Sequence, residues 1–168
     1  VWIGTQGGLY YVDIKNNEYK VYTSNNEAPR KVSDNLIYSL VFDHNNNLWI
    51  ATKNGLDKYV YSTGEFTNYA RNEDSENTLN DNYIVSLCYS SDSILWIGTK
   101  SGINHLDIEK NAFKHFSETD GLNSSTVYEI IEDDLGNMWF ATGKGLSQLK
   151  KGEKQLTTYS EEDGLQSI

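Results

Sequence analysis

The chain has 168 residues, of which 38% are hydrophobic and 12% aromatic, a composition typical of one folded domain and not of a disordered segment. Its formal net charge is −10, which repels nucleic acid and anionic lipid head groups, so we expect neither as a partner. No stretch approaches the roughly 18 consecutive apolar residues that cross a membrane, and a single cysteine, Cys88, excludes an internal disulfide.

Four tryptophans recur along the chain at nearly equal steps. Trp2, Trp49, Trp96 and Trp139 are separated by 47, 47 and 43 residues, and each opens the same phrase, WIGTQGGL, WIATKNGL, WIGTKSGI and WFATGKGL. A repeat of roughly 40 to 50 residues indicates a solenoid, a propeller or an array of small units.

The repeat unit contains four short strands. In the last unit, β-branched and aromatic residues gather in four runs separated by turn residues, at 125–132, 138–142, 146–150 and 155–159. Four antiparallel strands per repeat form one blade of a β-propeller, so we predict an all-β fold, a β-propeller segment. The blade segments are expected at about 1–23, 35–69, 82–116 and 125–159, within one domain that covers 1–168.

The strand count predicts an incomplete ring. The chain opens in the second strand of a blade and ends just before a first strand at Ser167–Ile168, which gives three full blades plus three strands of another. We interpret all four tryptophans as structural residues that pack, mostly buried, against a neighbouring blade. An arc this short leaves two blade faces uncovered, so we expect either self-association or cover by the remaining blades of a parent propeller.

Candidate ligand-binding residues lie in the loops at one face of the propeller. The hairpin between the second and third strands lies on the same face as the connection to the next blade, and loops on a rigid scaffold often carry binding sites. Tyrosines of the first strands (Tyr38, Tyr83 and Tyr128) are either sugar-stacking rings or core. The alternative for the polar residues is that they are ordinary turn residues. The ligand-binding residues that we predict are Arg30, Lys53, Arg71, Asn82, Lys100 and Lys144.

No catalytic constellation can be assembled from the sequence. His105 and His115 lie on expected neighbouring strands and could face each other, as a metal pair or as a surface pair. The pattern that joins Asp134 and Gly136 to Trp139 is similar to part of the Asp-box of sialidase propellers, which is a folding element. We therefore expect no catalytic residue, no metal site and no cofactor.

The whole chain resembles the two-component regulator propeller repeat. The pattern is N-x-V-x-x-I-x-x-D-x-x-G-x-x-W-I-G-T-x-x-G-L, with aromatic fourth strands and Asp-Gly-Leu connections. The matching positions include Val127, Asp133, Gly136, Trp139, Thr142, Gly145 and Leu146, the fourth strands at 66–69 and 113–116, and the connections at Asp120 and Asp163. Asp-Gly-Leu is absent from the loops at 24–36 and 70–82.

The resemblance implies a function. In that family such repeats form large propellers in the periplasmic part of hybrid sensor histidine kinases that often detect carbohydrates. It implies a periplasmic, ligand-sensing segment that is not itself an enzyme, with an oligosaccharide or other small ligand. Kinase activity and membrane attachment would then belong only to the parent chain. Two alternatives stay open: a structural or protein-interaction propeller without a small ligand, and a propeller glycosidase or lyase.

Overall fold

The computed structural model describes residues 1–166, which form four antiparallel sheets that follow one another along the chain. The first sheet has three strands, β1 (Trp2–Thr5), β2 (Gly8–Asp13) and β3 (Glu18–Tyr22). The second consists of β4 (Ile37–Phe42), β5 (Leu48–Thr52), β6 (Gly55–Val60) and β7 (Glu65–Tyr69). The third consists of β8 (Ile84–Tyr89), β9 (Ile94–Thr99), β10 (Gly102–Asp107) and β11 (Ala112–Phe116). The fourth consists of β12 (Val127–Glu132), β13 (Met138–Thr142), β14 (Gly145–Leu149) and β15 (Leu156–Tyr159).

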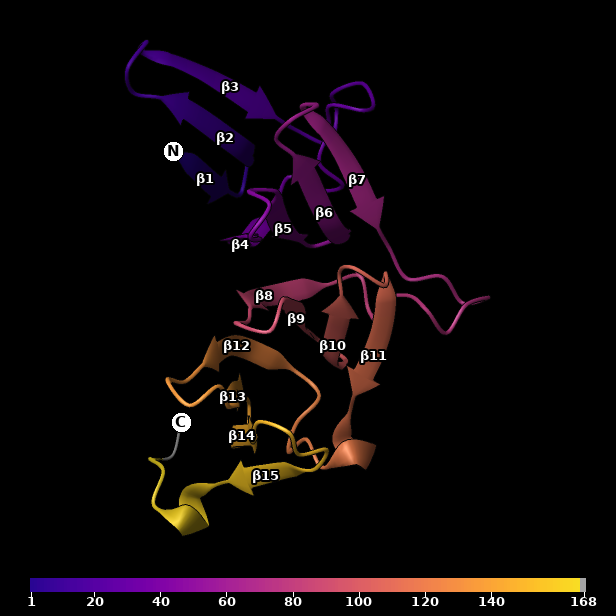
Figure 1. Ribbon diagram of the computed structural model, residues 1–168, viewed down its shortest axis with the longest axis vertical. Helices are drawn as coiled ribbons and strands as arrows, with labels where there is room; N and C mark the ends of the chain where they lie inside the picture. The colour runs from indigo at the N-terminus through magenta and orange to yellow at the C-terminus, as the bar shows by residue number, and fades with distance from the viewer. Residues whose placement is uncertain (167–168) are drawn as a thin grey trace.

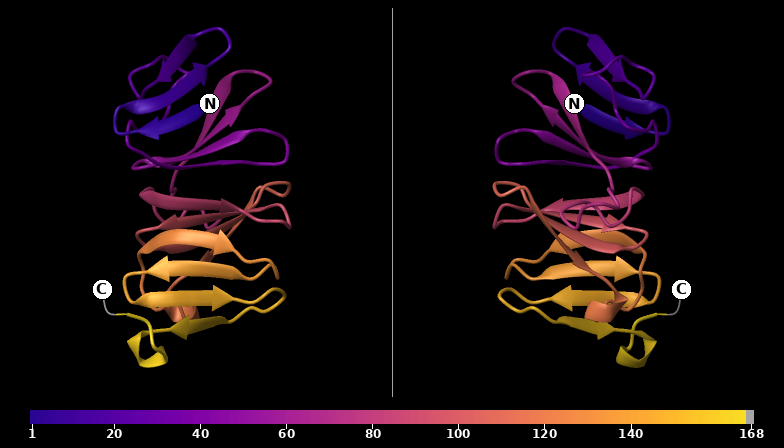
Figure 2. Two further views of the ribbon diagram at one scale, coloured as in Figure 1. Left: turned by 90° about the vertical axis from the view of Figure 1, so that its left-hand side faces the viewer. Right: turned by 90° about the vertical axis from the view of Figure 1, so that its right-hand side faces the viewer.

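Each sheet is a meander in which successive strands pair, and we call the sheets the first to fourth blades. The blades fan out as an arc with β1, β4, β8 and β12 on its inner side and β3, β7, β11 and β15 on its outer side (Figure 1). Seen from the side, the blades are stacked in chain order (Figure 2). The predicted all-β propeller architecture is therefore confirmed. The first strand expected to follow at Ser167–Ile168 lies outside the described residues.

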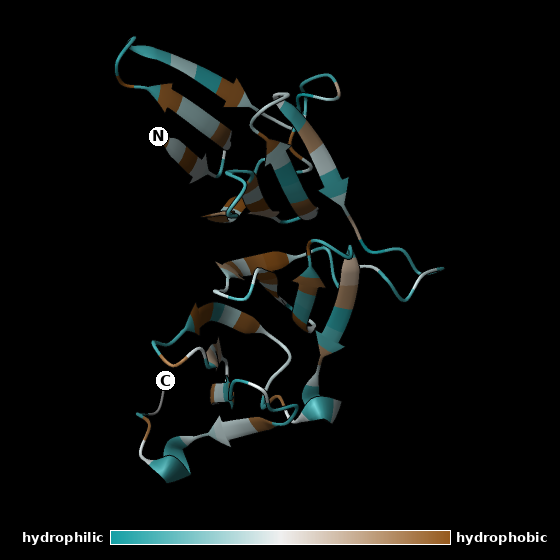
Figure 3. Cartoon of the chain, in the orientation of Figure 1, coloured by the Kyte–Doolittle hydropathy of each residue, from teal (hydrophilic) through white to brown (hydrophobic). Residues whose placement is uncertain are grey.

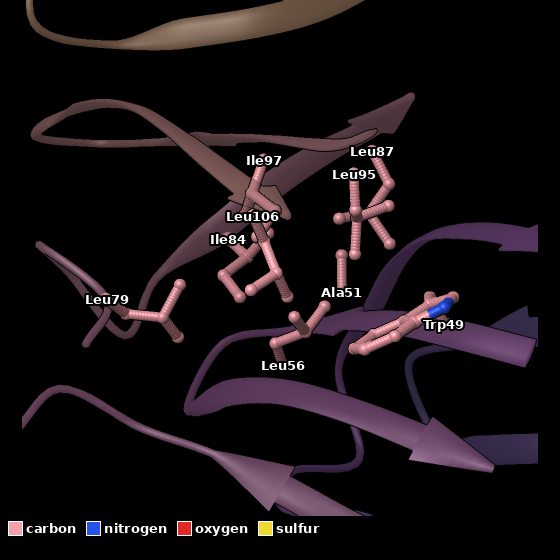
Figure 4. Close-up of a cluster of buried hydrophobic side chains, with 9 residues drawn as sticks. All are labelled: Trp49, Ala51, Leu56, Leu79, Ile84, Leu87, Leu95, Ile97 and Leu106. Carbon is pink, nitrogen blue, oxygen red and sulfur yellow. The ribbon is translucent and has the colours of Figure 1, made fainter. Parts of the chain in front are cut away.

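The hydrophobic core is divided among the three interfaces between blades. Between the second and third blades, Trp49, Ala51 and Leu56 pack against residues of the next sheet (Figure 4), among them Ile84, Leu87, Leu95, Ile97 and Leu106. Separate clusters fill the interfaces on either side. The longest connections and the two short helical turns are hydrophilic (Figure 3). The interfaces thus behave as sheet-on-sheet cores, which is why the strands carry apolar residues on both faces.

Three of the four tryptophans, Trp2, Trp49 and Trp96, pack against the following blade. Trp49 is 1% exposed and Trp96 is 5% exposed, and the Trp96 ring lies 5.6 Å from Phe140 of the fourth blade. The Trp2 ring lies 4.9 Å from Tyr59 of the second blade. Trp139 is only half-buried and stacks on Tyr159 of its own blade.

In the second and fourth blades, an aspartate in the first turn of the blade accepts a hydrogen bond from the tryptophan indole. Asp43 accepts the indole N–H of Trp49 at 3.0 Å, and Asp133 accepts that of Trp139 at 2.9 Å. The hydrogen bond from Trp139, followed by that from Asn137, lowers the pKa of Asp133 to about 2. The carboxylate that binds the tryptophan is thus Asp133, six residues before the indole, and not the neighbouring Asp134 of the Asp-box-like pattern.

The Asp-Gly-Leu connections form short 3₁₀ helices at Glu118–Asp120 and Glu161–Asp163, which the sequence analysis did not predict. Each begins with a capping box, in which Ser117 and Asp120, or Ser160 and Asp163, satisfy each other's backbone N–H groups. Each helix ends at a glycine in the left-handed conformation. These turns fix the direction in which the chain leaves the third and fourth blades.

Candidate functional site

The hairpins between second and third strands share one local design. A threonine hydroxyl, on Thr5, Thr52, Thr99 or Thr142, donates to the carbonyl of the glycine three residues later at 2.8–3.1 Å. That glycine has φ between 115° and 124° in all four hairpins. The hairpins lie beside the connections between blades, because the Lys53 and Lys100 N–H groups donate to Leu36 and Tyr83 carbonyls. We call this end of the arc the hairpin face.

Each connection is fixed to the hairpin face by a buried polar network. Asn80 accepts a hydrogen bond from Thr99 at 3.1 Å and exchanges two with Asn104, on the third strand of the same blade. In the fourth blade, Asn123 accepts from Thr142 and Ser147. The network repeats from blade to blade, and it positions the hairpin face as a rigid surface.

In the second blade this network contains a buried carboxylate. Asp57 is 1% exposed and accepts hydrogen bonds from Ser33 N–H and Oγ and from Asn68 Nδ2 at 2.8–3.0 Å. Burial raises the pKa of Asp57, and the three hydrogen bonds oppose that effect. The corresponding positions in the third and fourth blades are Asn104 and Ser147, so an ionisable group is not required by the fold.

Two tyrosines and a lysine, Tyr38, Tyr83 and Lys100, contact one another on the hairpin face. The Lys100 Nζ stands 4.0 Å from the centre of the Tyr83 ring, and the Tyr83 hydroxyl is 2.6 Å from that of Tyr38 in the preceding blade. The shared hydrogen bond, followed by burial, raises the pKa of Tyr38 to about 12. Tyr38 and Lys100 are exposed, so a ring face and a cation are both presented to solvent.

The other residues predicted to bind ligand are distributed differently. Asn82 accepts the Arg71 N–H on its side chain and the Gly55 N–H on its carbonyl, so its polar groups hold the connection. Arg71 and Lys53 are exposed on the same face, whereas the Lys144 carbonyl accepts from Asn123. The structure thus brings Arg71 together with Asn82 and leaves Lys53, Lys100 and Lys144 on separate hairpins.

Arg30 lies away from the hairpin lysines. It lines a cavity of about 620 Å³ together with Lys20, Tyr22, Tyr59 and Tyr61. The same three tyrosines and Lys20 also line a neighbouring cavity of about 350 Å³ between the first and second blades, whose wall includes Trp2 and Tyr11. This aromatic cleft was not predicted from the sequence, although Tyr11 lies directly across the β1–β2 pair from Trp2.

The end of the arc opposite the hairpin face carries the turns at 43–47, 90–94 and 133–137, and we call it the turn face. Here Ser91 donates from N and Oγ to the Glu132 carboxylate at 2.8 and 2.6 Å, which ties the third blade to the fourth. His44 and Tyr89 make a similar contact between the second and third blades.

The histidine pair considered from the sequence does not form. His105 pairs with Lys114 and Asn104 pairs with His115, so the two histidine side chains point to opposite faces of the sheet. His115 Nε2 instead contacts the Thr78 carbonyl at 2.7 Å. Within residues 1–166, no group of three or more His, Cys, Asp or Glu residues could hold a metal ion. The helices found there are all too short to cross a membrane.

The arc of four-stranded meanders and its clamped hairpins define the class of protein: a segment of a β-propeller. Residues 31–54, 78–101 and 121–144 match the two component regulator propeller family. The chain therefore carries two-component regulator propeller repeats, one at the start of each of the second, third and fourth blades. No curated protein sequence matches the chain.

Solved structures show the same fold. The extracellular domain of the putative hybrid two component system BT3049 from B. thetaiotaomicron is 26% identical, with a TM-score of 0.77 over 93% of this chain and 21% of that one. That of BT4673 from the same organism is 20% identical, with a TM-score of 0.78 over 95% and 20%. The chain thus spans about one fifth of these domains. Virginiamycin B lyase from Staphylococcus aureus, at 10% identity, has a TM-score of 0.68 over 95% of this chain and 51% of the lyase.

Proposed function

We propose that this chain is part of the extracytoplasmic sensor propeller of a hybrid two-component system and that the ligand it helps to detect is a carbohydrate. The observation that carries the proposal is the set of three regulator propeller repeats in a chain that is 26% identical to the extracellular domain of BT3049. The lyase likeness, at 10% identity, concerns the fold alone.

The hairpin face is the ligand-facing surface in this proposal. This face carries four exposed cations. Three are on the hairpins (Lys53, Lys100 and Lys144) and one, Arg71, is on a connection between blades. The Lys100 ammonium and the rings of Tyr83 and Tyr38 supply a charge and an aromatic surface for one sugar unit. Arg30 would contribute only to a ligand that extends to the outer side, and Asn82 supports the surface without contacting the ligand.

The coding sequence that flanks the chain tests the sensor part of the proposal. We expect a membrane-spanning helix and a histidine kinase core downstream in the parent protein, and a parent that lacks both contradicts it. Ligand binding is tested by titrating the parent's extracytoplasmic region with a panel of oligosaccharides in a calorimeter. Lys100→Ala in that region is expected to weaken binding of the active saccharide about tenfold, the effect of losing roughly 1.4 kcal/mol.

A further inference from the structure

A third cavity, on the turn face, lies between the third and fourth blades and is lined by residues of β9–β11, of β13 and β14 and of the turns beside them. Its volume is about 660 Å³, within the range of small-molecule sites. Its apolar wall is formed by Trp96 and Phe116, whose rings stack 5.9 Å apart, with Met138 and Leu149 beside them. Both walls belong to complete blades, because the third and fourth blades each have all four strands within the described residues.

Two buried nitrogen atoms in this wall have no hydrogen-bond partner. They are Trp96 Nε1 and His105 Nδ1, on side chains that both line the cavity and whose rings meet edge to face at 4.8 Å. Burial lowers the pKa of His105, which favours the neutral ring. A buried polar group without a partner costs about 1–3 kcal/mol, so an oxygen acceptor that reached these nitrogens from the cavity would recover part of that free energy.

The missing partner is explained by one residue. The position that holds Asp43 in the second blade and Asp133 in the fourth is Ser90 in the third. The Ser90 hydroxyl is directed to the Ile94 carbonyl and the Asp92 carboxylate at 3.0 and 2.5 Å, and it does not reach the indole. Only in the third blade, among the described residues, does a buried tryptophan lack its own carboxylate acceptor.

The wall of the cavity carries four lysines and three carboxylates, those of Asp92, Glu132 and Glu153. Lys114, Lys150, Lys151 and Lys154 line it, and none of the four has a carboxylate within 4.0 Å in the described part of the chain. Two of the three carboxylates have protein donors, since Glu132 accepts two hydrogen bonds from Ser91 and Asp92 accepts one from Ser90. Four lysines against three carboxylates leave a local excess of one positive charge in a chain whose net charge is −10, and the unpaired ammonium groups are available to an anion.

The residue across the strand pair from the tryptophan differs from blade to blade. Directly across the strand pair from Trp49 stands Lys58, whose Nζ lies 5.1 Å from the centre of the indole ring and covers it. The residue across from Trp96 is His105, whose ring meets the indole edge to face at 4.8 Å. The corresponding residue in the first blade is Tyr11, across from Trp2, and both of these line the cavity between the first and second blades.

We propose that the cavity between the third and fourth blades binds an anionic saccharide, a sugar ring that bears a carboxylate or a sulfate. The ring packs against the half-buried Phe116, an oxygen of the sugar accepts the Trp96 indole N–H, and the acidic group binds the lysines of the wall. This site is separate from the hairpin face. It rests on the proposed function only in taking a saccharide as the ligand.

The test follows the Trp96 indole N–H by nitrogen-15 NMR in the 168-residue chain. The chain has four tryptophans, so four indole signals are expected, and Trp96→Phe identifies the one from Trp96. The probes are digalacturonate, a chondroitin sulfate disaccharide and, as the neutral probe, cellobiose. We expect the Trp96 signal to shift with one or both acidic probes and not with cellobiose, and the acidic probe that works distinguishes a carboxylate from a sulfate ligand.

Variants then identify the groups that bind the probe. Lys151→Ala with Lys154→Ala should weaken the response of the Trp96 signal about tenfold, whereas the matched exposed lysine variant Lys15→Ala should leave it unchanged. Ser90→Asn supplies an uncharged internal acceptor and should abolish the response. A Trp96 signal that ignores both acidic probes, or that responds equally in the lysine double variant, overturns this inference. The sensor proposal is untouched by that result, because it stands or falls on the flanking sequence and on binding at the hairpin face.

Discussion

At the residue scale, a single acceptor decides whether the tryptophan of a blade is satisfied. Asp43 and Asp133 each bind the indole and at least two backbone N–H groups of their own turn, whereas Ser90 binds no indole. The same substitution that leaves Trp96 unpaired is what opens a site for a ligand oxygen. Stability and binding are therefore in competition at this position.

Exchanging these turn residues should change stability in opposite directions. Ser90→Asp gives Trp96 an acceptor and is expected to raise the free energy of unfolding by about 1 kcal/mol, whereas Asp43→Ser leaves the indole of Trp49 unpaired and should lower it by about 1–3 kcal/mol. Urea unfolding followed by tryptophan fluorescence measures both. If the two variants shift the midpoint in the same direction, the indole hydrogen bond is not the relevant interaction.

Asp57 should make stability depend on pH in the acidic range. Because its pKa is raised by burial in the folded chain, folding is favoured by its protonated form. Its contribution is therefore most favourable below the unfolded value of 3.8 and declines as pH rises from there through the folded pKa. Asp133, with its pKa lowered to about 2, acts in the opposite sense, and its contribution is lost as pH falls from 3.8 toward 2.

Asp57→Asn isolates the first effect, since Asn104 shows that an amide fits the same network in the next blade. The variant is expected to gain stability relative to the wild type as pH rises above 3.8, with the difference constant above the folded pKa. Urea midpoints from pH 3 to pH 8 give the comparison. A difference between the two proteins that does not vary with pH shows that the Asp57 pKa is the same in the folded and unfolded chains.

At the element scale, the hairpin between second and third strands depends on its glycine. Gly102 has φ of 118°, and a Cβ there would lie 2.4 Å from the Phe116 carbonyl oxygen at the end of the fourth strand. The same contact recurs at Gly145 with the Tyr159 carbonyl at 2.2 Å. The glycine therefore lets the outer strand approach the hairpin, and the closeness of β11 to β10 follows from it.

Gly102→Ala should lower the free energy of unfolding by more than about 1 kcal/mol, because the alanine adds backbone strain to a clash with main-chain atoms. Gly7→Ala is the matched control, since a Cβ at that hairpin position would meet only the Thr5 hydroxyl at 3.8 Å. Thermal unfolding of both variants measures the difference. Equal melting temperatures for the two would mean that the outer strand moves away without cost.

The strands themselves could be predicted because the same pattern of strand and turn residues recurs in four repeats. The run at 138–142 was placed correctly from one repeat, and the neighbouring runs needed shifts of one or two residues at their ends. The polar networks were missed because they depend on contacts between residues 19 and 24 apart, such as Asn123 with Thr142 and Ser147. The 3₁₀ turns were missed although their capping boxes join residues only three apart, Ser117 with Asp120 and Ser160 with Asp163. The cavity between the third and fourth blades could not be inferred, since it depends on how the side chains of two blades pack around Trp96.

At the scale of the whole molecule, the fourth blade presents a face that resembles the packed face of the second. Trp139, Ala141 and Leu146 correspond to Trp49, Ala51 and Leu56, yet the first three are half-buried whereas the latter are at most 1% exposed. Apolar surface of this kind is normally covered by another sheet. In a longer piece of the parent protein, a further blade of the propeller would cover it.

For the 168-residue chain alone we expect concentration-dependent association through this face. Light scattering over a concentration series should show a mass rising from 19.1 kDa toward that of a dimer, because two copies can bury their uncovered faces against each other. Trp139→Glu places a charge in the centre of the face and should keep the chain monomeric. Leu135→Glu, at a turn residue that is 79% exposed, is the control that should still associate. A wild-type chain that stays monomeric at high micromolar concentration, with Trp139 fluorescence insensitive to a soluble quencher, would show that the face is already covered within one molecule.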